Sequence, residues 1–395
     1  MKVIHFITDE KHLNNTIDFF EDIKELENRY ILVTYDETPF NYLDSNKIER
    51  VPITDIKRII SKPNLCDVIV LHNLTSLPCK FIKDINDDIK VVWFSWGFDI
   101  YENVYPQFKL IPLKNQIKHK SYPLRYRLRI LNEKRRLLFK KKDNNTKQER
   151  TNFIKAIHRI DYYSGVLSIE WNFLNNNSFF KAKQIQFNYP PQKDVYTESI
   201  LFKDLRPKGN NILVGNSGND LGNHGNSFWI LSNLNLHDKK IVVPLSYGGN
   251  SLYRSIVNKM GIKYFGNHFI ALDSFISESD YYAYLQSFAV TIFNIKRQAA
   301  VGNIINSFWN GAKVFLPEDS ICYKHFKSQG YHVFSIEKDL NQKEIDSLLS
   351  DEMIIDNRKK IIKYHSYEAI KEKTTNSFRQ IANDLNIPFS ASPIS

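Results

Sequence analysis

The sequence predicts an α/β protein built from two doubly wound, Rossmann-like domains with parallel sheets. Short apolar runs alternate with helical patterns in two separate series, and a proline-containing connector at 187–210 divides the two series. A chain of 395 residues, 42% of them hydrophobic, is long enough to form two cores. We therefore expect an N-terminal domain at 1–205, a C-terminal domain at 206–365 and a helical tail at 366–395 that packs back across the domain boundary.

The first series contains four apolar runs that end in polar or glycine residues. Buried strands of a parallel sheet have this composition. A helical pattern at 12–27 follows the first run and supplies the crossover that parallel strands need. The expected strands are KVIHFIT at 2–8, RYILVTYD at 29–36, DVIVLHN at 67–73 and KVVWFSWG at 90–97.

The second series repeats the same organisation after the connector. Most of its apolar runs precede a polar loop and a helical pattern, as at 251–261 and 278–288. A second α/β domain of the same type is therefore expected. Its expected strands are NILVGN at 211–216, KKIVVPLSYG at 239–248, KYFGN at 263–267, FAVTIFN at 288–294 and AKVFLPED at 312–319.

A basic segment at 109–142 carries the charge excess of the chain. It holds thirteen Lys or Arg residues against the single acid Glu133, while the whole chain has a formal charge of +11. Leu, Ile, Tyr and Phe are interleaved with these cations, which is the composition of a helix that lies on an anionic membrane surface. Two alternatives are a solvated charged hairpin on the first domain and a nucleic-acid-binding arm. No RNA- or DNA-binding motif accompanies the segment, so we expect no nucleic-acid partner.

The cysteine pattern and the hydropathy of the sequence indicate the cellular compartment. Cys66, Cys79 and Cys322 form no CxxC pair, which fits a reduced cytosolic protein without disulfides or a zinc site. Asp9 interrupts the apolar N-terminus too early for a signal peptide, and no window reaches 18 uninterrupted apolar residues. We expect a cytoplasmic protein that is peripheral on the inner face of a membrane.

A glycine-rich turn opens the second domain with the sequence ILVGNSG at 212–218. It has neither the GxGxxG spacing of a dinucleotide site nor the Lys of a P-loop. It nevertheless follows a strand at the carboxyl edge of the predicted sheet, where open α/β sheets bind ligands. Gly215 and Gly218 would let a ligand approach the backbone, beside Asn216 and Ser217. The alternative is an ordinary tight turn.

A second loop of this domain combines two cations with a helix start. Lys296 and Arg297 follow a predicted strand, and a helix begins near Ala299. The free amides around 300–303 would share this helix N-terminus with the cations. Such a terminus suits a diphosphate, while the alternative is a solvated pair of side chains on a loop.

Several strings resemble one known family, the bacterial TDP-N-acetylfucosamine:lipid II N-acetylfucosaminyltransferases, which belong to glycosyltransferase family 56. The family contains 4-alpha-L-fucosyltransferases. A weaker resemblance to the same family is the pattern formed by His12, Asn14 and Thr16. The segment at 109–150, which includes the basic segment, is longer and more basic than the family predicts. The strings are ILVGNSG at 212–218, VVPLSYG at 242–248, YYAYLQSFAVTIFNIKRQAAVGN at 281–303, GAKVFL at 311–316 and WFSWGFDIYE at 93–102.

The resemblance implies the GT-B glycosyltransferase architecture, in which two Rossmann-like domains face a central cleft. It further implies a nucleoside-diphosphate sugar donor, dTDP-linked, in the second domain and a polyprenyl-diphosphate-linked saccharide acceptor at the first. No Asp-x-Asp motif is present, so we expect neither a metal nor a cofactor, and cationic and amide groups would stabilise the leaving diphosphate. The expected donor-binding residues are Gly215, Asn216, Ser217, Gly218, Tyr247, Lys296, Arg297, Gln298, Val301, Gly302 and Asn303.

The acceptor side would follow the strand that ends at WFSWGFDIYE. Asp99 is the first candidate for the base that activates the acceptor hydroxyl, followed by Glu102 and His12. Asp99 as a helix cap and His12 as a helix-entry residue are the structural alternatives. Trp96, Gly97 and Tyr101 complete the expected acceptor side. Alternative functions are a nucleic-acid-binding protein that uses the basic segment and a non-catalytic sugar-binding protein with this fold.

Overall fold

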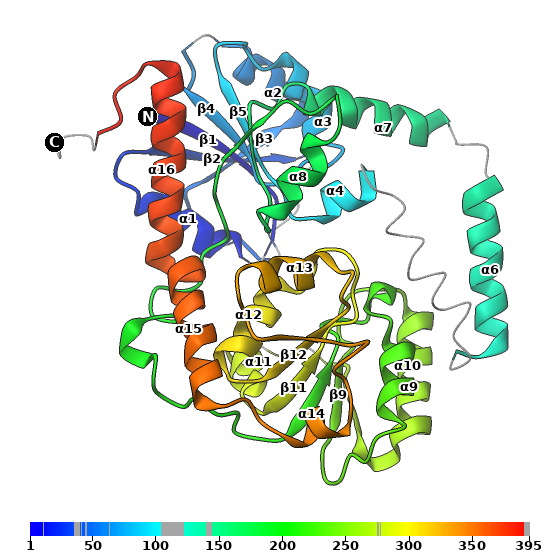
Figure 1. Cartoon of the computed structure of the whole chain (residues 1–395). Helices are drawn as coiled ribbons and strands as arrows, with labels where there is room; N and C mark the ends of the chain where they lie inside the picture. The colour runs from blue at the N-terminus through cyan, green and yellow to red at the C-terminus, as the bar shows by residue number, and fades with distance from the viewer. Residues whose placement is uncertain are drawn as a thin grey trace. The chain divides into compact units, whose positions relative to one another are not determined.

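The computed structural model divides the chain into two compact units (Figure 1). It describes residues 1–390 except 11, 35–39, 41, 44–45, 63, 104–121, 140–143, 275 and 277. The first unit comprises Met1–Val104, Lys142–Thr197 and Lys363–Ser395, and the second comprises Tyr105–Lys141 and Glu198–Ile362. The sequence had placed the basic segment with the first unit, whereas contacts place Tyr105–Lys141 with the second.

The first unit contains a seven-stranded sheet in the order β3-β2-β1-β4-β5-β6-β7, and every strand pair is parallel. All four expected strands form, with small shifts at their ends. Short additional strands at 48–52, 162–164 and 183–184 extend the sheet at both edges. The strands are β1 Lys2–Ile7, β2 Glu27–Thr34, β3 Ile48–Pro52, β4 Val68–Leu71, β5 Lys90–Phe94, β6 Tyr162–Ser164 and β7 Lys183–Gln184.

The helices of the first unit include the last helix of the chain, α16. Its Phe378 and Ile381 are fully buried and join the core formed by Phe19 and Phe20 of α1. Ser377 of the same helix accepts a hydrogen bond from the amide of Gln186. The helices are α1 Leu13–Glu21, α2 Ile53–Ile60, α3 Pro78–Phe81, α4 Phe98–Asn103, α7 Asn144–Ile157, α8 Ile169–Asn175 and α16 Tyr367–Leu385.

The second unit contains a six-stranded parallel sheet in the order β10-β9-β8-β11-β12-β13. Four of the five expected strands form. The strand expected at 263–267 is wrong, because α10 continues through Phe265, whose ring enters the core, and the strand begins at Phe269. The strands are β8 Asn211–Val214, β9 Ile241–Pro244, β10 Phe269–Leu272, β11 Phe288–Ile292, β12 Lys313–Leu316 and β13 Val333–Ser335.

Helices of the second unit connect these strands, and one helix comes from the basic segment. That helix, α6, buries Tyr126 and Ile130 in the core beside α10. Tyr122, just before the helix, joins the same core, and its hydroxyl accepts a hydrogen bond from the amide of Gly225 at 3.0 Å. The helices are α6 Leu124–Phe139, α9 His224–Leu231, α10 Ser251–Phe265, α11 Glu278–Leu285, α12 Val301–Trp309, α13 Ile321–Ser328, α14 Gln342–Asp346 and α15 Asp351–His365, whose last residues belong to the first unit.

A buried arginine joins the connector to the second unit. Arg358 of α15 is 2% exposed, and its guanidinium donates to the carbonyls of Leu201, Asp204 and Trp309 at 2.7–2.9 Å. It also lies over the indole of Trp309 at 4.8 Å. A planar group with five donors can satisfy several carbonyls at once, so this side chain fixes the entry to the second sheet.

Both sheets reverse their strand order next to their first strand. In the first unit the reversal lies between β1 and β4, and in the second it lies between β8 and β11. Open parallel sheets bind ligands outside the carboxyl ends of the strands at such a switch point. The loops after these four strands are therefore the first places to look for a site.

Candidate functional site

The loop after β8 is glycine-rich because it packs on a buried histidine. A Cβ at Gly215, where φ is +74°, would lie 2.6 Å from Nε2 of His224, and a Cβ at Gly222 would lie 2.7 Å from Cε1 of the same ring. His224 has no exposed surface, and its Nδ1 lies 3.1 Å from the hydroxyl of Tyr253. Close packing therefore requires these two glycines.

The same loop also packs against the turn that follows β9. The amide of Gly218 donates to the carbonyl of Tyr247 at 2.8 Å, and a Cβ at Gly249 would overlap the carbonyl of Gly218. Ser217 is 8% exposed, so its hydroxyl is not presented to solvent as the sequence led us to expect. Asn216 remains half-buried, and the side chain of Tyr247 is 56% exposed. Of the predicted residues on these two loops, Asn216 and Tyr247 have side chains that a ligand could reach.

The loop after β11 brings the predicted cations to the start of α12. Lys296 is already paired, because its ammonium contacts the carboxylate of Asp319 and lies 3.8 Å from that of Glu337. Arg297 is half-buried and donates to the carbonyl of Gln298 at 3.1 Å. The positive charge of Lys296 is thus compensated within the protein, which was not apparent from the sequence because both acids lie more than twenty residues away.

The first turn of α12 presents free backbone amides. Ala300 precedes the helix with φ at +59° and makes no side-chain cap. The amide of Ile304 bonds to the carbonyl of Ala300, whereas no acceptor in the described chain bonds the amides of Val301, Gly302 and Asn303. A Cβ at Gly302 would meet no atom within 4 Å. The helix therefore begins with unsatisfied donors and partial positive charge at the switch point of the second sheet.

The side chain of Gln298 lies just before this helix. It is 6% exposed, and its Oε1 has no hydrogen-bond partner within the described residues. A buried acceptor without a donor is unfavourable unless a ligand or water supplies one. Gln298 thus stays among the candidates for ligand contact.

In the first unit, His12 lies in the loop between β1 and α1, at the switch point. Its imidazole is exposed to solvent, and its ring centroid lies 4.6 Å from that of Trp96 and 5.4 Å from that of Tyr189. The protein around the ring lowers the pKa of His12 to about 4. A neutral imidazole that keeps exposed surface therefore borders the half-buried Trp96 at this edge.

Asp99, the first candidate for the base, is a buried structural residue. It has no exposed surface, and its carboxylate accepts hydrogen bonds from the amides of Leu74 and Trp96 at 3.1 Å and from the indole of Trp93 at 2.9 Å. Burial raises its pKa from 3.8 to about 6, while these donors act in the opposite direction. Because protein groups surround the carboxylate, its assignment as the base that meets a substrate hydroxyl is wrong.

The other predicted residues of this loop also serve the fold. Tyr101 is 2% exposed and donates to the carboxylate of buried Glu170 at 2.9 Å. Gly97 is buried, has φ at +88°, and its carbonyl accepts the amides of Ile100 and Tyr101. Glu102 belongs to α4, but its side chain lies outside the described residues. Of the three proposed bases, His12 is therefore the described side chain that solvent reaches.

A small cavity of about 160 Å³ marks the carboxyl ends of β1, β2 and β4. Thr8, Asp9 and Asn73 provide its polar groups, and the amide of Asn73 donates to the hydroxyl of Thr8 at 3.0 Å. The sequence interpretation passed over these residues. These residues lie at the ends of two apolar runs, and this position is the sequence signal that could have identified them.

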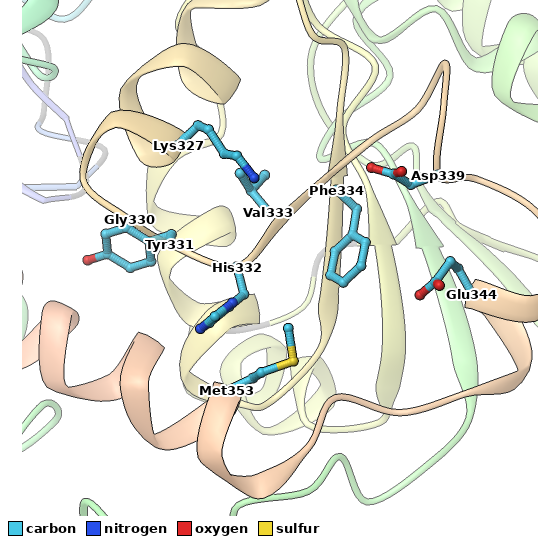
Figure 2. A pocket seen from close by; sticks show the side chains of 9 residues that line it. All are labelled: Lys327, Gly330, Tyr331, His332, Val333, Phe334, Asp339, Glu344 and Met353. Carbon is cyan, nitrogen blue, oxygen red and sulfur yellow. The ribbon is translucent and has the colours of Figure 1, made fainter.

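A cavity of about 430 Å³ lies elsewhere in the second unit (Figure 2). Its residues come from α13 and the segment that leads into β13, from β13 itself and the loop that follows it, and from α14 and α15. Glu344 at this cavity pairs with Lys313, the first residue of β12. The cavity is lined by Lys327, Gly330, Tyr331, His332, Val333, Phe334, Asp339, Glu344 and Met353, none of which the sequence singled out.

Across the described residues, His, Cys, Asp and Glu side chains form no group of three or more that could hold a metal ion. Within the same part of the chain, no helix combines the length and the apolar character needed to cross a bilayer.

Comparisons with known proteins identify a family by sequence and a fold by structure. A family model described as 4-alpha-L-fucosyltransferase, glycosyl transferase group 56, matches residues 171–376, more than half of the chain. No curated protein matches the sequence significantly. Many solved structures share the fold of the whole chain.

Three of these structures show the range of the likeness. Sucrose-phosphate synthase from Thermosynechococcus elongatus has a TM-score of 0.63 at 9% identity, with 97% of this chain and 100% of that chain covered. The glycosyltransferase AviGT4 of avilamycin A biosynthesis has a TM-score of 0.52 at 10% identity, with 97% of this chain and 98% of that chain covered. The lipopolysaccharide outer core galactosyltransferase WaaB has a TM-score of 0.55 at 8% identity, with 96% of this chain and 99% of that chain covered. These are GT-B enzymes, so the predicted fold class is confirmed.

The raised pKa of Asp99 leads to a prediction about stability. Its carboxyl takes up a proton in the folded state at a higher pH than in the unfolded state, so protonation near pH 6 favours folding. Relative to Asp99→Asn, which cannot titrate, the wild type should gain up to about 3 kcal/mol of unfolding free energy as the pH falls from 7 to 4. Urea denaturation at several pH values measures this difference. A difference that does not vary with pH would contradict the assigned burial.

Proposed function

We propose a specific reaction for this chain, which belongs to the 4-alpha-L-fucosyltransferase family, glycosyl transferase group 56, and is a GT-B glycosyltransferase. The enzyme moves a deoxy or acetamido sugar, fucosamine-like, from a dTDP-sugar or related nucleoside-diphosphate sugar. The acceptor is a polyprenyl-diphosphate-linked saccharide of cell-surface polysaccharide synthesis. The observation that carries the proposal is the uncapped N-terminus of α12 at the switch point of the second sheet.

The donor diphosphate would bind at this helix N-terminus. Three amides without protein acceptors and the nearby Arg297 supply positive charge, which suits two phosphate groups. Gly302 supports this assignment. Alanine is the better helix former by about 1 kcal/mol, and a methyl group would meet no protein atom here, so packing alone does not explain a glycine. Its absent side chain would let the ligand approach the backbone.

The leaving group would be stabilised by the same groups. As the bond between the sugar and the phosphate breaks, negative charge grows on the diphosphate oxygen. Fixed amide dipoles and the Arg297 guanidinium oppose this charge without rearranging. The proposed reaction therefore requires neither a metal ion nor a cofactor. Tyr247 and Asn216, on the neighbouring loops, are placed to contact the nucleoside.

The acceptor hydroxyl would be activated by His12. A neutral imidazole can take the proton that the attacking oxygen releases as it bonds to the sugar carbon. The exposed ring of His12 meets this requirement, and burial removes Asp99 from consideration. Trp96, which borders His12, offers an aromatic surface against which a saccharide ring can pack.

The helix α6 would hold the enzyme at the membrane that contains its acceptor. Its inner face is buried in the second unit, whereas Leu124 and Leu128 are 66% and 51% exposed, and Arg125 and Arg135 are exposed with them. Apolar and cationic side chains on one outward face suit an anionic bilayer surface, where each cation contributes about 1 kcal/mol. Residues 109–121 and 140–142 of the basic segment lie outside the described residues.

Donor binding should raise the melting temperature of the purified protein, because the ligand binds the folded state. In a thermal-shift screen, we expect a dTDP-sugar to give a larger shift than UDP- or GDP-sugars. Gly302→Ala should melt at or above the wild-type temperature without ligand and should lose most of the shift. The exposed Lys259→Ala variant of α10 is the control. A full shift in Gly302→Ala would place the donor elsewhere, and no shift with any nucleotide sugar would contradict the proposed donor class.

His12→Gln should lower kcat about 100-fold or more, because the base no longer assists deprotonation. Its donor-induced thermal shift should remain, since His12 is not in the donor-binding unit. Initial rates at saturating concentrations of both substrates measure the effect. His158→Gln, which changes an exposed histidine of the same unit, is the control. Unchanged turnover in His12→Gln would exclude this residue as the base.

The wild type should float with vesicles that contain phosphatidylglycerol, and high salt should weaken this binding. The double variant Leu124→Asp, Leu128→Asp should lose it, because carboxylates would meet the anionic surface. Phe202→Asp, at an equally exposed apolar residue outside α6, serves as the control. Retained flotation in the double variant would contradict the assigned face. Binding of an oligonucleotide in preference to the vesicles would support the nucleic-acid alternative.

A further inference from the structure

A row of hydrogen-bonded polar groups lies buried in the first unit, and the reaction proposed above uses only its outer end. Nδ1 of His5, on β1, lies 3.1 Å from Nε2 of His72, which directly follows β4. Nε2 of His5 lies 3.1 Å from the Asn28 Oδ1, and Nδ1 of His72 lies 3.3 Å from the hydroxyl of Tyr189. The indole nitrogen of Trp96 donates to that same hydroxyl.

Each hydrogen bond in this row has a single possible direction. The Asn28 amide nitrogen donates to the carbonyl of Phe20, so Oδ1 must accept from Nε2 of His5. A neutral His5 then accepts at Nδ1 from Nε2 of His72. A neutral His72 has only Nδ1 left as an acceptor, which faces Tyr189. Because an indole nitrogen can only donate, every donor points inward from Trp96 to Asn28.

The two histidines remain neutral in this environment. His5 is 0% and His72 1% exposed, and burial lowers the pKa of His5 to about 3 and that of His72 well below its usual value. The rings of Phe20 and Phe94 pack against His72 with centroids at 6.0 and 5.6 Å. Each of the two histidines therefore keeps one tautomer at neutral pH, and the row does not itself supply a base.

The outer end of the row fixes the Trp96 side chain. The main-chain amide of this residue donates to the carboxylate of Asp99, and its indole nitrogen donates to Tyr189, so the residue is held at both ends. The carbonyl oxygen of His72 also lies 3.1 Å from the Tyr189 hydroxyl, so this oxygen and Nδ1 of the same residue share the one proton of that hydroxyl. The rings of Trp96 and Tyr189 both border His12. Loss of the Tyr189 hydroxyl would therefore release the Trp96 ring, which borders the proposed base His12.

We propose that Tyr189 is a positioning residue for the acceptor site, and that the buried His72 and His5 orient its hydroxyl. The Tyr189 hydroxyl holds the Trp96 indole edge inward, so that the ring stands beside His12 as a fixed surface for the acceptor saccharide. This role rests on the function proposed above. It assigns a purpose to two buried histidines that touch no substrate.

The first test follows the indole proton of Trp96 and needs no turnover. The chain has five tryptophans, so protein labelled with ¹⁵N-tryptophan gives five indole signals, and Trp96→Phe identifies the one that belongs to residue 96. Tyr189→Phe keeps the ring but removes the acceptor of this proton. We expect that signal to move and its exchange with solvent to become at least about tenfold faster, while the other four stay in place.

The second test compares the kinetics of the two substrates. Tyr189→Phe should lower kcat/KM for the acceptor about three- to tenfold, the effect of one lost hydrogen bond, and leave KM for the nucleotide sugar unchanged. Tyr162→Phe is the matched control. It removes a tyrosine hydroxyl that bonds Asp384 in the same unit, away from Trp96, and should leave both substrates' kinetics unchanged.

Three results would overturn the positioning role. They are an unmoved Trp96 signal in Tyr189→Phe, wild-type acceptor kinetics in that variant, and equal losses in Tyr162→Phe, which would mean that general destabilisation is the cause. If the wild type transfers no sugar from any nucleotide sugar, the proposed function itself fails, and the positioning role fails with it. Normal wild-type transfer with an unmoved Trp96 signal would overturn the positioning role alone.

Discussion

Parallel strand pairing is the constraint on which both units depend. A parallel sheet needs a crossover between successive strands, so all strands of a sheet end at the same edge, and most of them are followed by a loop and a helix. In both units the strand order reverses beside the first strand, which leaves two neighbouring loops free to diverge. The helix start at Gly302 and the exposed His12 both lie on loops of this kind. The positions of the proposed donor-binding groups and of the proposed base therefore follow from the topology.

The two units have the same architecture but present different chemical groups at their switch points. In the second unit, the switch point offers backbone amides and Arg297, which suit an anionic ligand. In the first, it offers a neutral imidazole beside aromatic rings, which suits proton transfer and the packing of a saccharide. A glycosyltransferase needs both functions, and in the proposed reaction each unit would supply one of them.

Several polar residues near these sites serve packing and not ligand binding. Gly215 and Gly222 make room for the buried His224, and Asp99 closes hydrogen bonds of three neighbouring segments. Lys296 is held by two carboxylates. Such groups keep the loops rigid, and a rigid loop can hold a small number of exposed groups in a fixed arrangement. The residues left exposed, such as His12 and Gly302, are then the ones available for chemistry.

The sequence by itself determined the two series of strands, the parallel sheets and the family. Apolar runs and helical periods record local burial, and the strings around Gly215 and Trp96 carry the family likeness. Only the tertiary structure decided which polar side chains reach solvent. Tyr101 is buried because Glu170 lies opposite it, and Lys296 is neutralised by Glu337, a partner forty-one residues away. Local patterns do not encode these pairings, because they depend on which distant segments the sheet brings together.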